Sequence, residues 1–278
     1  SRKIRASSAR LFDQVKARDV IREIRQLMGE WYDTAIVRSV VRHFRIINRL
    51  YRGKYRGYRA CNTDYHDLQH IHDVLLAAIR LVDAYNLSLA DPLPARETLQ
   101  LCLAALYHDT GFIQESWDAD GTGAKYTRIH IRRSHEFVRT QAARLKIDLE
   151  LVDGICTMIS ATDLALEWEE LSFASPAEQQ ASCIIGTADI IGQMADRMYL
   201  EKLLFLYYEL REAAFASLTT AFDIIRNTAS YYDSTQARLQ TCLGGMDRYL
   251  PMHFKVRYGI DSNLYQEAID RQMNYLQV

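Results

Sequence analysis

Apolar residues recur every three or four positions along most of this 278-residue chain, and this spacing is the feature that most constrains its fold. Only 4 prolines and 12 glycines interrupt the pattern, which favours long helices over many short strands. No segment shows the sustained alternation of apolar and polar residues that is typical of strands. The sequence therefore predicts an all-α fold.

The spacing predicts helices over residues 8–28, 31–50, 65–87, 95–110, 130–146, 149–162, 177–195, 197–228, 229–243 and 262–276. The segments between them predict loops, of which the longest are 51–63, 112–126 and 163–176. No linker rich in proline or serine divides the chain. We therefore expect one helical domain over residues 61–278, with an N-terminal helical extension over residues 1–60 that packs on the core or forms a homodimer.

Charge and cysteine content limit the class of protein. The formal net charge is −1, so no bulk attraction to nucleic acid is expected. No run of about 18 apolar residues indicates a membrane span, and no signal-peptide pattern is present. The 5 cysteines include no CxxC pair, which favours reduced thiols over disulfides or structural zinc. These features predict a cytoplasmic protein that binds neither nucleic acid nor membrane.

Two histidines and a carboxylate share one face of the predicted helix over 65–87. At about 100° per residue, His66, His70 and Asp73 fall within about 60° of each other, on a face that continues with apolar residues. A divalent cation is one partner that suits buried imidazole and carboxylate together. The alternative is that these are core histidines bonded to the backbone. His72 falls on the side predicted to be solvated, together with Gln69, Arg80 and Asp83.

Two further apolar runs contain ionisable residues. The first run ends in His108 and Asp109, with Gly111 in the place of a helix C′ residue. Asp189 lies inside the second run, where an isolated carboxylate is disfavoured and buried aspartate is usually paired or bound to metal. A capped or salt-bridged pair is the alternative for His108 and Asp109. Asp196 is interpreted as structural.

Taken in order, His70, the adjacent pair His108 and Asp109, and Asp189 resemble the ligand pattern of the HD superfamily of metal-dependent phosphohydrolases. That family is all-helical and places these residue types on successive helices around one or two divalent ions. The resemblance covers about residues 64–200. It implies an HD-domain-like bundle that binds metal through these four residues and hydrolyses a phosphate ester.

The first motif is also similar to the YHNxxHxxDV signature of class I cyclic-nucleotide phosphodiesterases; here it reads Tyr65-His66-Asp67-x-x-His70-x-x-Asp73-Val74. In that family the first histidine donates a proton to the leaving oxygen, so the resemblance implies that His66 is the general acid. Asp67 replaces the asparagine, and no further histidine directly follows His108-Asp109. The chain is therefore expected to be closer to the broader bacterial-type HD hydrolases.

Two histidines and two aspartates suit Mn²⁺, Mg²⁺, Fe²⁺ or Zn²⁺, with Asp109 as the bridge if two ions bind. The expected substrate is a small, nucleotide-like phosphomonoester or phosphodiester. Such a substrate needs cationic contacts. Three residues are candidates for substrate binding or for supporting the ligands: Asp73, Arg133 and His135. The last two lie in a basic segment with Arg128 and Arg132, for which a solvated helix start is the alternative.

Two other functions remain open from the sequence. Oxidation by a di-iron centre would need extra buried histidines, whereas His72, His130 and His253 are predicted to be peripheral. A non-catalytic nucleotide-binding or regulatory module would keep the fold without the chemistry. A plain helical scaffold would follow if the ionisable groups did not meet in space.

Overall fold

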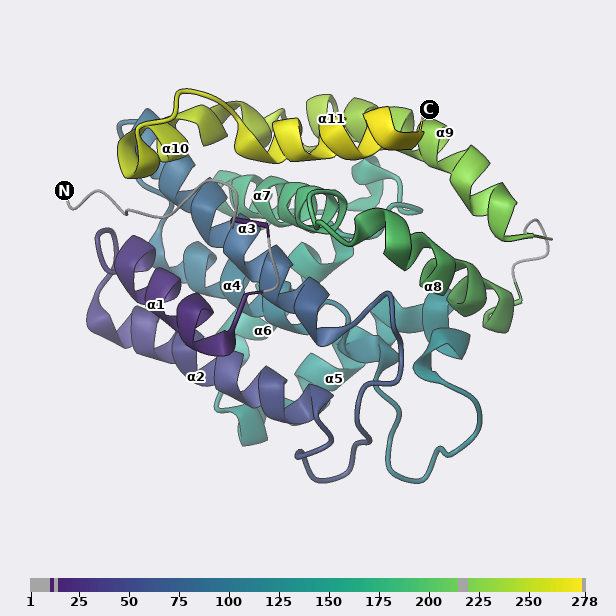
Figure 1. Cartoon of the computed structure of the whole chain (residues 1–278). Helices are drawn as coiled ribbons and strands as arrows, with labels where there is room; N and C mark the ends of the chain where they lie inside the picture. Colours follow the sequence, from purple (N-terminus) through teal and green to yellow (C-terminus); the bar gives the residue numbers. More distant parts are fainter. Residues whose placement is uncertain (1–10, 13–14, 215–219, 277–278) are drawn as a thin grey trace.

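The computed structural model describes residues 11–12, 15–214 and 220–276 (Figure 1). Within these ranges it consists of eleven α-helices packed as one bundle, without β-strands, which confirms the predicted all-α fold. The helices are α1 (Ala17–Met28), α2 (Thr34–Tyr51), α3 (Leu68–Ser88), α4 (Ala95–Tyr107), α5 (His130–Leu145), α6 (Leu149–Ser160), α7 (Pro176–Met194), α8 (Tyr199–Glu212), α9 (Ala221–Gln240), α10 (Leu250–Tyr258) and α11 (Leu264–Leu276). None of these described helices is long and apolar enough to cross a membrane.

Helix α3 forms the centre of the bundle and is buried along nearly its whole length. Helix α7 packs closely on it at Gly192, where a Cβ atom would lie only 3.2 Å from the backbone of Asp73 and Val74. Helix α4 packs against both α3 and α7, and one hydrophobic core runs through all three. This arrangement brings ionisable residues from three separate segments of the sequence to one place.

The N-terminal helices α1 and α2 pack on α3 and α4 and contribute fully buried residues such as Ile24 and Phe44 to the same core (Figure 1). They explain why the prediction of a surface position for His72 was wrong. The His72 side chain is buried, with its ring 4.9 Å from that of Phe44 and its Nε2 3.2 Å from Asn48 Oδ1. Helix α2 covers the side of α3 that the helical wheel left to solvent.

Arg80 and Asp83, also predicted to be solvated, are 2% and 1% exposed. Arg80 donates to both carboxylate oxygens of Glu23 in α1, at 2.6 and 2.9 Å. Asp83 accepts hydrogen bonds from His253 Nδ1 at 2.7 Å and from Arg257, both in α10. His253 is therefore buried rather than peripheral. A buried charge that is paired in this way ties the N-terminal and C-terminal helices to α3.

Several predicted helix boundaries were wrong. The predicted helix over 8–28 begins only at Ala17, and residues 8–10 and 13–14 of that range lie outside the described residues. The predicted helix over 197–228 is two helices, because α8 ends at Glu212 and α9 begins at Ala221. Helix α10 was not predicted.

Candidate metal centre

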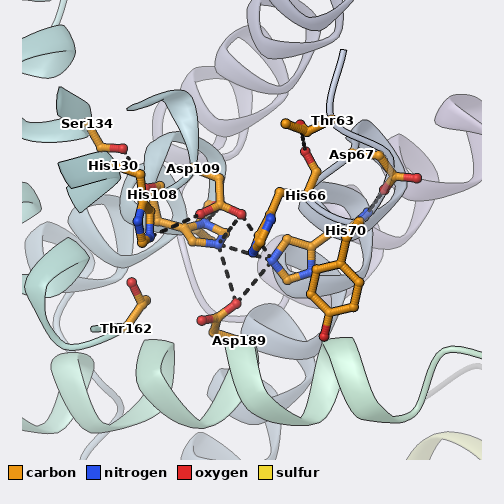
Figure 2. Close-up of polar contacts among 12 residues, drawn as sticks. Thr63, His66, Asp67, His70, His108, Asp109, His130, Ser134, Thr162 and Asp189 are labelled. Atoms are coloured by element: carbon orange, nitrogen blue, oxygen red, sulfur yellow. Dashed lines mark hydrogen bonds and ion pairs between the residues drawn. The ribbon is translucent and has the colours of Figure 1, made fainter. Parts of the chain in front are cut away.

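Three chain segments bring ionisable side chains into one cluster where α3, α4 and α7 meet (Figure 2). His70 stands in the first turn of α3. His108 and Asp109 directly follow the last residue of α4, and Asp189 lies in the C-terminal half of α7. The structure thus brings together all four residues that the sequence suggested as metal ligands.

The distances within the cluster are short and nearly equal. The Nε2 atoms of His70 and His108 lie 3.3 Å apart, and each lies 3.3 Å from Asp109 Oδ2. Asp189 Oδ1 lies 3.1 Å from the first Nε2 and 3.3 Å from the second. Neighbouring ligands around one ion are about 3.0 to 3.4 Å apart when the metal–ligand bonds are about 2.1 Å. Asp109 Oδ2 and the two Nε2 atoms therefore have the spacing of a ligand set, and Asp189 Oδ1 lies against both histidines.

Two polar atoms of the cluster are suited to contact with a cation. Asp109 Oδ2 is buried and has no hydrogen-bond partner among the described residues. His108 Nδ1 lies 2.9 Å from the carbonyl oxygen of Ala105, which can only accept, so Nδ1 carries the hydrogen. The Nε2 of the neutral ring then directs its lone pair at the cluster, as metal-ligating histidines do. The residues present therefore fit a divalent ion.

Without metal, the cluster holds protons instead. Burial alone would lower the pKa of His108, but the carboxylates of Asp109 and Asp189 outweigh it and hold that pKa well above its usual value. The same balance raises the pKa of His70 to about 9. Burial would raise the pKa of Asp109 and Asp189, but His108 outweighs it and both are lowered. The site therefore requires positive charge, which either protons or a metal ion can provide.

The turn that carries His108 is fixed by α5. Ser134 Oγ donates to the carbonyl oxygen of His108 at 2.6 Å and accepts from Gly111 N at 2.9 Å. Gly111 has no positive φ, contrary to the expected C′ role; a Cβ atom there would lie 2.0 Å from the carbonyl oxygen of His130. Arg133 Nε donates to the Gly111 carbonyl at 2.8 Å. Arg133 therefore supports the turn rather than facing the cluster.

His66 lies two residues before α3 and not on it, because Asp67 is the N-cap of that helix. Its side chain is 18% exposed, and its Nδ1 lies 2.6 Å from Oε2 of Glu209 in α8. The other oxygen of Glu209 accepts from Tyr65 N at 2.7 Å. The His66 ring stacks on Phe112, with centroids 4.3 Å apart. Glu209 was not among the predicted residues.

His130, predicted to be peripheral, lies beside the cluster. Its Nε2 is 3.9 Å from Asp109 Oδ1, whereas His70 and His108 face the other oxygen of this carboxylate, Oδ2. Its Nδ1 lies 2.6 Å from the carbonyl oxygen of Thr127, and its ring stacks on Phe112 at 4.6 Å. Figure 2 shows this ring directed toward Asp109. The prediction was wrong because the sequence places His130 at the start of a helix but does not reveal which other segments that end of the helix contacts.

A family model described as Npun_R2479-like matches residues 54–243, which is more than half of the chain. The chain belongs to the Npun_R2479-like family. The matched segment runs from before α3 through α9 and contains every residue of the cluster described above. No curated protein and no protein of known structure matches the chain.

Two other candidate residues of the Npun_R2479-like segment lie outside the cluster. Asp73 accepts from Gln69 Nε2 at 2.9 Å, and burial, with a smaller effect of nearby Asp196, raises its pKa to about 8. His135 Nε2 lies 3.1 Å from Ser160 Oγ, between α5 and α6. Neither side chain contacts the four candidate ligands through these bonds.

Proposed function

We propose that this chain is a metal-dependent phosphohydrolase of the HD type, which hydrolyses a phosphate ester of a small, nucleotide-like molecule. The observation that carries the proposal is that the Nε2 atoms of His70 and His108 each lie 3.1 to 3.3 Å from carboxylate oxygens of both Asp109 and Asp189. Their order along the chain and their all-α setting support the resemblance to the HD superfamily. Asp189 keeps 21% of its side chain exposed, so the cluster reaches solvent through this residue.

These four residues would hold one divalent ion, and their mixture of imidazole and carboxylate suits manganese, magnesium, iron or zinc. When bound, the ion supplies a Lewis acid for a phosphoryl oxygen and lowers the pKa of a water molecule. The chain itself contributes the arrangement of the ligands. Ser134 and the Ala105 carbonyl hold the backbone and ring of His108 in place, which fixes the direction of its Nε2.

A second ion position is supported between Asp109 and His130. If Nδ1 of His130 donates to the Thr127 carbonyl, its Nε2 carries a lone pair that lies 3.9 Å from Asp109 Oδ1. Two metal–ligand bonds of about 2.1 Å can cover this separation, so His130 and Asp109 could hold a second ion. One oxygen of Asp109 would then contribute to each of the two ion positions.

His66 would donate the proton to the leaving oxygen. Because Nδ1 of His66 donates to Glu209, Nε2 is the nitrogen left to carry the transferred proton. Stacking on Phe112 fixes the plane of the ring. Figure 2 shows the ring beside Asp109 and His70, where a phosphate ester bound at the cluster would present its leaving group.

The proposal is tested with p-nitrophenyl phosphate and bis(p-nitrophenyl) phosphate, before and after loading the protein with Mn²⁺. Wild type is compared with Asp189→Asn and with Asp153→Asn, whose side chain is 86% exposed and lies in α6. We expect Asp189→Asn to lower the rate by at least about 100-fold, because ligand geometry controls metal binding, and Asp153→Asn to have no effect. Equal rates in the two variants would contradict the proposal.

Oxidation by a di-iron centre is the second candidate, because one observation favours it. His130, which the sequence predicted to be peripheral, lies next to Asp109, so the cluster has an additional histidine. Oxygen consumption by the iron-loaded protein, without hydrolysis of either ester, would favour this function over the first.

A further inference from the structure

A hollow of about 630 Å³ opens beside the candidate metal centre. It lies between the 3-10 turn Gly123–Ile129, the start of α5 and the loop that follows α6. His130 borders both places, since its ring lines the hollow while its Nε2 lies 3.9 Å from Asp109 Oδ1. The hollow has the size of a small-molecule site. A group bound in it would therefore adjoin a group bound at the cluster.

Most of the charge around this hollow is positive. Arg128 and Arg132 line it together with the imidazoles of His130 and His135. Asp163 is the carboxylate among the lining residues, and its Oδ1 accepts from a backbone N–H of its own loop at 2.9 Å. Planar guanidinium groups bind phosphate oxygens through paired N–H donors. The lining thus favours a phosphate group over a neutral or cationic one.

The three arginines of this basic segment differ in what they contact. Arg133 faces inward and pairs with Glu115 at 3.1 Å. Arg128 donates to the carbonyl oxygen of Ala214 at 3.3 Å. Arg132 is exposed in the first turn of α5, and within the described part of the chain it makes no hydrogen bond or ion pair. Its guanidinium is therefore available to a ligand in the hollow.

We propose that this hollow binds a second phosphoryl group of the substrate, with Arg132 as the main contact. The inference rests on the proposed function, because it takes the phosphate that reacts to lie at the metal cluster. It narrows the substrate class to phosphoesters that carry two separated phosphoryl groups. His130, which stands between the two places, would lie between the two groups.

Phosphate binding in the hollow is tested by isothermal titration calorimetry. The full chain, as purified, is titrated with inorganic phosphate at constant ionic strength. Arg132→Ala is compared with wild type and with Arg139→Ala, an exposed arginine of the same helix that pairs with Asp153 at 2.8 Å. We expect Arg132→Ala to weaken phosphate binding about tenfold, the effect of losing charge-assisted hydrogen bonds, and Arg139→Ala to leave it unchanged. Equal affinities in all three proteins would overturn the proposal.

Kinetics then connect the hollow to the substrate. For an ester that carries a second phosphate, Arg132→Ala should raise KM about tenfold at unchanged kcat, and for the matched monophosphate it should change neither. An equal change for both esters would overturn the proposal. A protein that contains no metal and hydrolyses neither ester would instead refute the proposed function. Metal content and hydrolysis are measured separately from the phosphate titration, so the two failures can be distinguished.

Discussion

Glu209 Oε2 lies 2.6 Å from Nδ1 of His66, although the two residues are 143 positions apart in the chain. The second oxygen of the same carboxylate accepts from the backbone of Tyr65. Helix α8 thus holds the segment before α3 in place and determines which nitrogen of His66 remains free. This contact makes α8 part of the candidate site, and it leads to the first two predictions.

Replacing His66 by asparagine should slow hydrolysis only where the leaving group needs a proton. For an alkyl phosphate we expect the rate to fall about 10² to 10⁴-fold, the range of general acid catalysis. For p-nitrophenyl phosphate, whose leaving group is stable without a proton, the loss should be much smaller. Both rates are measured at equal metal content. A similar loss with both esters would show that His66 is not the proton donor.

Glu209→Gln should also slow hydrolysis mainly for the alkyl ester, but by less than His66→Asn. Glu209 acts through His66 as a positioning residue, so we expect a loss of about tenfold in kcat for the alkyl ester, with KM little changed. Glu212→Gln is the control, because Glu212 lies on the same helix but bonds to Thr122. If the two variants lose activity equally, a general effect on α8 is the better explanation.

Ser134→Ala should loosen the turn that carries two ligands. It leaves the buried carbonyl of His108 and the N–H of Gly111 without their partner, which lowers the free energy of unfolding by about 1 to 3 kcal/mol. Because supporting contacts orient metal ligands, metal affinity should fall about 10 to 100-fold. Thr140→Ala, at an exposed position of the same helix, is the control. Unchanged metal affinity in Ser134→Ala would argue against this supporting role.

Metal binding should release protons at neutral pH. In the metal-free protein the pKa of His70 is raised to about 9, because the carboxylates of Asp109 and Asp189 outweigh the effect of burial. This proton stabilises the metal-free fold fully below the usual pKa of 6.5, and the contribution is lost as the pH rises through about 9. Calorimetry of Mn²⁺ binding at pH 7, in buffers of different ionisation enthalpy, should detect about one proton or more released per ion. Binding without proton release would contradict the assignment of His70 as a ligand.

Three of the four candidate ligands could be singled out because they stand in or at the end of an apolar run, whereas His70 is singled out by the helix face it shares with His66 and Asp73 and by the resemblance to the HD superfamily. Ionisable groups in such runs must find partners in the core, and His108, Asp109 and Asp189 show this directly in the sequence. Glu209 gives no such signal, since α8 contains several charged residues on an ordinary amphipathic pattern. His130 likewise opens a polar helix. Tertiary packing alone brings these two residues to the site.

The packing of α1 and α2 over one side of α3 could not be predicted from the local sequence pattern either. The polar residues His72 and Arg80 indicate a solvated side unless α1 and α2 are known to pack there. The break between α8 and α9 lacks a proline or glycine. A local signal for the start of α9 is the capping box of Thr220 and Asp223.

The central claim is most directly tested by elemental analysis of the purified protein for bound metal. His70→Gln is compared with His72→Gln, since both replace a buried histidine in the first turns of α3 but only His70 faces the cluster. The account predicts one or two equivalents of a divalent metal in wild type and in His72→Gln, and loss of metal in His70→Gln. The same metal content in all three proteins, or none in wild type even after soaking with Mn²⁺, would contradict it.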